Sequence, residues 1–400
     1  MPTDRVLSGM RPTGALHLGH YHGALANWVR MQTEHECFFF VADWHALTTH
    51  YESPEVIGQN VWEMVIDWLA AGIDPERATL FIQSKVPEHA ELHVLLSMCT
   101  PLGWLERVPT YKDQQEKLSD KDLTTYGFLG YPLLQSADIL MYRAAWVPVG
   151  EDQVPHVELT REVARRFNHL FGRQPGLEER VAAARRRLGG KRAQAYDEYL
   201  QRHRERGDPE AVAQASSLVN GTQSLSDDER ATLIGWLEGG RRRILVEPQA
   251  RLTQASKVPG LDGAKMSKSY GNAVGMREDP ASVTRKLRQM PTDPARVRRT
   301  DPGEPERCPV WQLHKVYSNA EVQAWAQQGC RTAGIGCLDC KQPVIDAIVA
   351  EQTVFIDRAR PYVEEPRRVR DIMEAGCERA RAVARETMRD VRDAMGVGYA

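Results

Sequence analysis

Short apolar runs alternate with amphipathic stretches over residues 6–171, and this alternation constrains the fold more than any other feature of the chain. Residues 37–42 and 79–82 form apolar runs of the kind found in strands buried on both faces of a parallel sheet. The stretch 54–71 between them has its apolar residues at helical spacing. Strand and helix in repeated alternation predict a doubly wound α/β domain with a parallel, Rossmann-like sheet.

A chain of 400 residues is too long for one ordinary core, so we expect two domains. The strand–helix pattern places the α/β domain at residues 1–175, and it resumes at residues 244–279 with an expected strand at 244–246. The intervening residues 176–243 are charged and poor in strand formers, which predicts a helical insertion. Residues 280–400 are rich in arginine and show no strand signal, which predicts an all-helical C-terminal domain.

The charge and hydropathy of the chain limit its partners and its location. A formal net charge of −2 excludes a global positive field, so any contact with RNA would depend on local basic patches. The sequence has no apolar run long enough to cross a bilayer, and residues 1–10 lack the apolar core of a signal peptide. We therefore expect a cytoplasmic protein without a membrane partner, whose cysteines stay reduced.

Two histidines stand three residues apart at a glycine-containing turn between the first expected strand and helix. This spacing places His17 and His20 on one face of the first helical turn, where backbone N–H groups and the helix dipole attract an anion. Gly19 carries no side chain, so an adenine ring has room to lie on the backbone there. Taken alone, the pattern favours surface histidines at a helix N-terminus over an anion site.

A second cationic segment lies far along the chain, at residues 265–269. Lys265 and Lys268 are three residues apart on a stretch flanked by glycines, which permits a mobile loop. Two ammonium groups at this spacing can stabilise charge that develops on a polyphosphate. The alternative is a solvated basic turn. Considered together, the histidine turn and the lysine loop predict a triphosphate site approached from two sides.

The sequence HLGH followed much later by KMSKS resembles the signature pair of class I aminoacyl-tRNA synthetases. Further stretches, SGMRPTGALHLGHYHGAL, ATLFIQS, GYPLLQSADIL and VGEDQ, resemble bacterial tryptophanyl-tRNA synthetases. The resemblance covers nearly the whole chain except about residues 176–243. It implies ATP-dependent activation of L-tryptophan with Mg²⁺ on the phosphates, transfer of the product to tRNA(Trp), and a homodimer.

The resemblance also assigns roles to individual positions. It implies that His17, His20, Lys265 and Lys268 act in catalysis, and that Asp138 accepts the indole N–H of tryptophan. Indole nitrogen is only a donor, so a pocket for it needs a fixed acceptor; a helix carboxylate satisfied by a local partner is the alternative for Asp138. The remaining tryptophan-binding positions are Tyr131, Gln135, His45 and Gln153. The ATP-binding positions are Arg11, Pro12, Thr13, Gly19, His20, Gly150, Glu151, Asp152, Val258, Lys265, Met266, Ser267, Lys268 and Ser269.

Four cysteines gather late in the sequence: Cys308, Cys330, Cys337 and Cys340. In a reducing compartment, four thiols that end in C-x2-C favour a metal over disulfides. Zinc and an iron–sulfur cluster are both compatible with the spacing, as are plain buried cysteines. The segment GCRTAGIGCLDCK resembles that of tryptophanyl-tRNA synthetases that hold a [4Fe–4S] cluster, which favours the cluster over zinc.

The C-terminal arginines alternate with glutamates and aspartates, a pattern typical of a salt-bridged, solvated helix face. It is therefore the resemblance that assigns anticodon binding to residues 280–400. Two other functions remain open on the sequence alone: the related tyrosine enzyme, and a catalytically silent paralogue that binds RNA or senses redox state.

Overall fold

The structure is a computed structural model, and it describes residues 4–108, 125–172, 176–206, 208–237, 239, 243–252, 258–267 and 270–399. In these residues a sheet of parallel strands has the order β3-β2-β1-β4-β5. The predicted doubly wound class is confirmed. The order reverses between β1 and β4, and ligands of such sheets bind beyond the carboxyl ends of the strands at this point. The strands are β1 (Arg5–Met10), β2 (Glu36–Val41), β3 (Ala78–Ile82), β4 (Trp146–Val149) and β5 (Gln249–Leu252).

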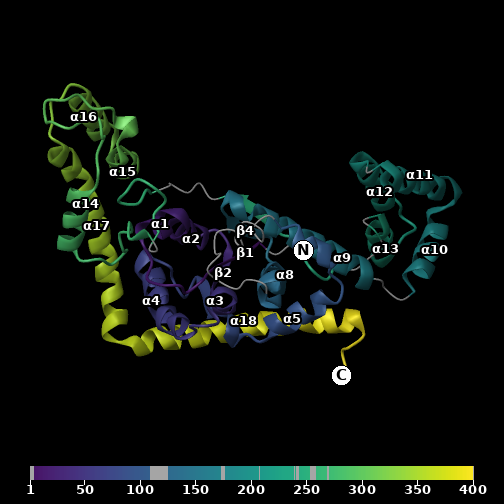
Figure 1. The fold of residues 1–400 in the computed structure, drawn as a ribbon. Helices are drawn as coiled ribbons and strands as arrows, with labels where there is room; N and C mark the ends of the chain where they lie inside the picture. Colours follow the sequence, from purple (N-terminus) through teal and green to yellow (C-terminus); the bar gives the residue numbers. More distant parts are fainter. Residues whose placement is uncertain are drawn as a thin grey trace.

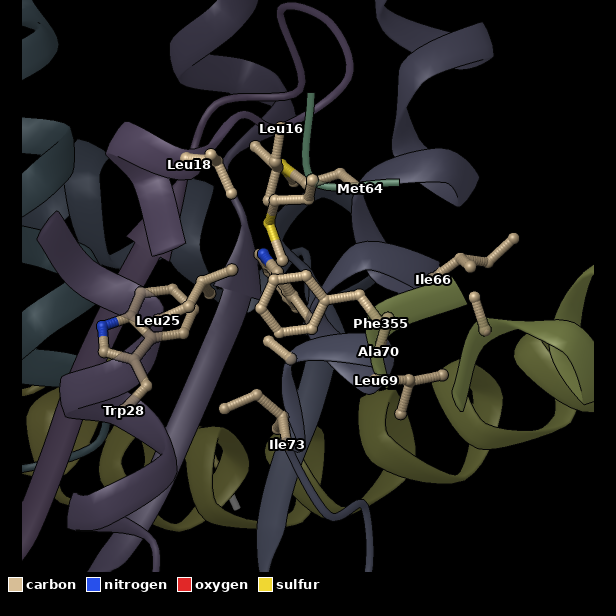
Figure 2. Close-up of a cluster of buried hydrophobic side chains, with 14 of the residues drawn as sticks. Leu16, Leu18, Leu25, Trp28, Met64, Ile66, Leu69, Ala70, Ile73 and Phe355 are labelled. Carbon is tan, nitrogen blue, oxygen red and sulfur yellow. The ribbon is translucent and has the colours of Figure 1, made fainter. Parts of the chain in front are cut away.

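Helices cover both faces of the sheet, because β2 and β3 are apolar on both sides (Figure 1). On one face, Trp28 stacks on Phe39 at 4.4 Å between ring centroids, and Phe355 belongs to the same core, which Figure 2 shows with Trp28 and Phe355 labelled. On the other face, Phe81 and Tyr142 belong to a second core. The helices of this part are α1 (Leu18–His20), the π-helical turn η1 (Tyr21–Leu25), α2 (Ala26–Met31), α3 (Asp43–His50), α4 (Glu55–Ala71), η2 (Gln83–Lys85), α5 (Glu88–Ser97), α6 (Leu102–Glu106), α8 (Tyr126–Met141), η3 (Glu151–Gln153) and α9 (Val154–Phe171).

The segment expected to be a helical insertion is helical and has a core of its own. Its centre is Tyr196, which is fully buried and donates its hydroxyl hydrogen to the carbonyl oxygen of Leu233 at 2.7 Å. In Figure 1 these helices extend from one end of the sheet, beyond α9. They are α10 (Leu177–Leu188), α11 (Gly190–Arg206), α12 (Pro209–Asn220) and α13 (Asp227–Leu237).

The prediction of a strand at residues 244–246 is wrong, because the strand in this region is β5, Gln249–Leu252. Ile244 and Leu245 are buried, but their backbone groups form hydrogen bonds with the side chain of Asn168 and not with a neighbouring strand of the described structure. Its Oδ1 accepts from both N–H groups at 2.9 and 3.0 Å, and its Nδ2 donates to the Leu245 carbonyl at 2.8 Å. A side-chain amide thus replaces the ladder that the apolar run predicted.

The C-terminal helices are built onto the α/β core. Helix α17 packs against α4, and α18 runs along the sheet beside β3 and α5 (Figure 1). The boundary expected at residue 280 stays a prediction, since side chains of both helices belong to the two sheet cores. None of the described helices has the length and apolar character needed to span a bilayer. The C-terminal helices are α14 (Pro280–Gln289), η5 (Pro305–Arg307), α15 (Pro309–Tyr317), α16 (Ala320–Arg331), α17 (Cys337–Glu364) and α18 (Pro366–Met395).

Candidate active site

A cavity of about 360 Å³ opens at the carboxyl ends of β1 and β4, where the strand order reverses. Its volume lies in the range of small-molecule sites. Strand β1 supplies one wall, and α8 together with Gly150 and Gln153 at the two ends of η3 supplies another. Of the positions predicted to bind tryptophan or ATP, those that line it are Arg11, His45, Tyr131, Gln135, Asp138, Gly150 and Gln153, and Leu7, Trp28 and Val149 add apolar surface.

Asp138 lies at the buried end of this cavity and is fully inaccessible to solvent. Its Oδ2 accepts from His45 Nε2 at 2.7 Å and its Oδ1 from His89 Nδ1 at 2.6 Å. Gln83 Nε2 reaches both oxygens, at 2.8 and 3.0 Å. Burial alone would raise the pKa of Asp138, but the hydrogen bonds from His45 and His89 outweigh it and hold the pKa at about 2. The cavity therefore ends in an ionised carboxylate.

The sequence left two interpretations of Asp138 open: an acceptor for the indole N–H, or a carboxylate satisfied by protein partners. The structure shows that protein partners are present. A carboxylate offers about four acceptor positions, and the three side chains occupy them. A ligand N–H can reach Asp138 by taking the place of one existing donor. Among these donors His45 also lines the cavity, which makes it the side chain best placed to yield.

Sequence reasoning missed Gln83 and His89, which are both fully buried. They come from the end of β3 and from α5, and nothing in their local sequence marks them as partners of a residue on α8. His89 also binds the Tyr142 hydroxyl through Nε2 at 2.7 Å. Because His89 Nδ1 must donate to the ionised Asp138, this second contact orients the ring.

Tyr131 faces the cavity from α8, with its ring perpendicular to that of His45 at 6.2 Å between centroids. Its hydroxyl lies 3.3 Å from Nε2 of His156, which is completely buried. Burial, followed by the neighbouring His45, lowers the pKa of His156 to about 4, so this ring is neutral at pH 7. His156 is a further site residue that the sequence did not single out.

The histidine turn has the geometry that its spacing predicts. His17 is the N-cap of α1, and its backbone N–H donates to His20 Nδ1 at 3.2 Å. The two rings lie 3.8 Å apart between centroids, on one face of the turn. The backbone N–H of Leu16, just before them, is fixed by buried Asp67 at 3.0 Å, another residue that sequence reasoning missed.

The chain around the lysine loop lies directly against the histidine turn. Leu18 donates to the Val274 carbonyl at 3.0 Å, and Met276 donates back to the Leu16 carbonyl at 3.0 Å. A Cβ added at Gly19 would lie 3.4 Å from the Cβ of Met266. Two motifs far apart in sequence are thereby adjacent in space. Lys268 and Ser269 lie outside the described residues.

The remaining positions predicted to bind ATP surround this edge of the sheet. Pro12 is buried and Thr13 is exposed in the turn after β1. Gly150 is the N-cap of η3, which presents Glu151 and Asp152 to solvent. Val258 and Met266 are buried in the first core, while Lys265 is exposed and Ser267 is half-buried.

A family model described as tRNA synthetases class I (W and Y) matches residues 3–188 and 237–351. The chain belongs to this class I synthetase family. The family predicted from the two motifs is thereby confirmed. The two matched spans leave out residues 189–236, which hold α11 and α12 and nearly all of α13.

Individual relatives of this class I synthetase agree over its full length. A tryptophan–tRNA ligase of Ralstonia nicotianae is 68% identical over 396 residues, 99% of each chain. One of Thermotoga maritima is 43% identical over 99% of this chain and 100% of its own. A crystal structure of tryptophanyl-tRNA synthetase from Campylobacter jejuni, complexed with ADP and tryptophan, has a TM-score of 0.73 at 27% identity, covering 98% of this chain and 99% of that chain.

The four late cysteines of the synthetase lie in one neighbourhood, at the start of α15, in α16 and at the start of α17. Burial, and then the neighbouring Cys308, Cys330 and Cys337, raise the pKa of the Cys340 thiol to about 12. A Cβ added at Gly303 would lie 2.7 Å from Cys330 Sγ. Among the residues that the structure describes, however, no group of three or more His, Cys, Asp or Glu side chains has an arrangement that could hold a metal ion. The predicted iron–sulfur motif is therefore not shown.

Proposed function

We infer that the chain is a tryptophan–tRNA ligase. It activates L-tryptophan with ATP to tryptophanyl-adenylate and transfers the amino acid to tRNA(Trp), with AMP and pyrophosphate as products. The observation that carries this function is the 68% identity to the Ralstonia ligase over nearly the whole length of both chains. The cavity is consistent with it, since the ionised carboxylate of Asp138 stands at its buried end and Arg11 also lines it.

In the activation step, the tryptophan carboxylate attacks the α-phosphorus of ATP, and pyrophosphate leaves. No covalent enzyme intermediate is required, so the protein contributes positioning and charge stabilisation. We propose that His17 and His20 bind the nucleotide from one side, with Lys265 and Lys268 on the phosphate tail from the other. Mg²⁺ accompanies the phosphates, as expected for an ion that keeps most of its water and few protein ligands.

We propose that Asp138 selects tryptophan by accepting its indole N–H in exchange for the bond from His45. The predicted pocket residues Tyr131, Gln135 and Gln153 surround the same space. Phenylalanine has no N–H to replace the displaced bond from His45, so it would leave one acceptor position of Asp138 unpaired, and sites of this design discriminate strongly against such analogues.

The second candidate is the tyrosine ligase, because the family model covers both the tryptophan and the tyrosine enzymes. Amino-acid-dependent exchange of pyrophosphate into ATP distinguishes the two. We expect exchange with L-tryptophan and none above background with L-tyrosine or L-phenylalanine at equal concentration. Exchange with tyrosine alone would replace the proposed function by the second, and no exchange with any of the three would favour the silent paralogue.

We propose that the four cysteines hold a [4Fe–4S] cluster, with zinc as the alternative. The thiol donor set suits both, and the four cysteines come from the start of α15, the end of α16 and the start of α17. When bound, such a group would join α15, α16 and α17 in a structural role. Protein purified without oxygen should be brown. Its absorbance in the violet–blue part of the visible spectrum should be lost on exposure to air. Colourless protein with stoichiometric zinc would rule out the cluster.

The remaining assignments follow from the family resemblance. We propose a catalytic domain at residues 1–175 and 244–279, a helical insertion at 176–243, and a helical anticodon-binding domain at 280–400. We also propose that the enzyme acts as a cytoplasmic homodimer. Some arginines of the last domain are already engaged: Arg381 binds Glu88 at 2.8 Å, and Arg392 binds Glu91 at 2.6 Å.

A further inference from the structure

One buried side chain, that of Asn272, which is 3% exposed, anchors the described part of the lysine loop on both sides of Met266. Its Oδ1 accepts from the Ser267 backbone N–H at 2.7 Å. Its Nδ2 donates to the Lys265 carbonyl at 3.1 Å and to Asp262 Oδ1 at 2.8 Å. A single amide therefore joins the turn that enters the loop to the two residues on either side of Met266.

The surrounding backbone is shaped to admit this amide. A Cβ added at Gly260 would lie 2.3 Å from Asn272 Nδ2, so only glycine leaves the required space. The backbone carbonyl oxygen of Asn272 in turn accepts from the Leu261 backbone N–H at 2.8 Å. Gly263 has a φ of +85°, in the region that favours glycine, and completes the turn. The position needs two donors and an acceptor in a small volume, which among short side chains only asparagine supplies.

The amide also fixes the relation between the two motifs. Met266, held between the two bonded residues, is 6% exposed and lies against Gly19 of the histidine turn. If Lys265 and Ser267 lost their common anchor, the loop would no longer be pinned on both sides of this contact. We propose that Asn272 is a positioning residue for the activation of ATP: it holds residues 265–267, and with them the Lys265 side chain, in the conformation that meets the triphosphate. This proposal rests on the proposed function.

Asn272→Ala tests the proposal, with Asn168→Ala as a matched control. The side chain of Asn168 likewise makes three hydrogen bonds, all of them to backbone groups, but it lies on the last turn of α9 and makes none to the two motifs in the described structure. In tryptophan-dependent pyrophosphate exchange, Asn272→Ala should lower kcat/KM for ATP on the order of 10- to 100-fold, the loss expected for misplaced groups. The dissociation constant of tryptophan should change less than twofold. Asn168→Ala should lower the melting temperature and keep its kcat/KM for ATP.

Three outcomes would overturn the proposal. One is an Asn272→Ala enzyme with unchanged kcat and KM for ATP. Another is equal loss of tryptophan and ATP binding, which would indicate collapse of the whole site. The third is an equal loss of activity in Asn168→Ala. Equilibrium binding of ATP separates this proposal from the function: if the unmodified chain exchanged no pyrophosphate, the function would fail, while weaker ATP binding by Asn272→Ala than by Asn168→Ala would still support the anchor.

Discussion

Asp138 is a buried negative charge surrounded entirely by donors. Burial of a carboxylate is costly unless hydrogen bonds compensate, and here the bonds from His45, His89 and Gln83 do so. The compensation has a functional consequence. A donor on the substrate finds a carboxylate that is already ionised and oriented, so binding exchanges one hydrogen bond for another and requires no change of protonation.

Asp138→Asn should remove both the charge and half of the acceptor capacity, and its amide N–H groups would face existing donors. We expect the free energy of unfolding at pH 7 to fall by about 3 kcal/mol, as when one partner of a buried ionic group is lost. Tryptophan binding should weaken about 10- to 100-fold, the value of a hydrogen bond to a charged group. Urea denaturation and equilibrium binding measure the two effects.

The same substitution has a predictable pH dependence. The pKa of Asp138 in the folded state, about 2, is below its ordinary value of 3.8. A lowered pKa contributes stability that is present above the unfolded value and is lost as pH falls through the folded value. The stability difference between the unmodified protein and Asp138→Asn should therefore be constant above about pH 5 and shrink between pH 4 and pH 2. A difference that stayed constant down to pH 2 would show that the charge is not the source.

The residues that sequence predicts in this site are those that carry recognisable local chemistry. His17 and His20 share a helical turn by their spacing alone, and in the structure their rings lie 3.8 Å apart between centroids. Gln83, His89 and Asn272 have no such local signal. Each is defined by a partner on another segment, and only the packing of β3 and α5 against α8, or of the loop on itself, reveals it.

At the scale of elements, burial decides which patterns can be predicted. Strands β2 and β3 are central or covered, so their apolar runs identify them correctly. Strand β5 is at the sheet edge with mostly exposed side chains, and Gln249–Leu252 therefore has no apolar run. The apolar residues just before it are buried under the Asn168 amide instead. The apolar run correctly indicated a buried segment at residues 244–246, but the hydrogen bonds place the strand at Gln249–Leu252.

At the scale of the whole molecule, helix α18 covers the edge of the sheet opposite β5. Strand β3 is at that edge, and an open edge exposes unpaired backbone groups. Helix α18 covers it: the Ile82 N–H lies 3.4 Å from Cys377 Sγ. Residues of the same helix enter both cores, Met373 on one side and Met388 on the other. The C-terminal helix thus closes the sheet and joins its two faces.

This closure requires glycine at position 376, because a Cβ there would lie 1.7 Å from the Leu80 carbonyl oxygen, which is part of the strand. Gly376→Ala should therefore displace α18 and lower the free energy of unfolding by about 3 kcal/mol, at the upper end of overpacking costs. Gly58→Ala is the control, since Gly58 is exposed within α4 and its Cβ would meet nothing within 4 Å. There the same change should stabilise the protein by about 0.5–1 kcal/mol, the helix preference of alanine over glycine. Denaturation of both variants compares them directly, and equal stability would mean that α18 does not seal the edge of β3.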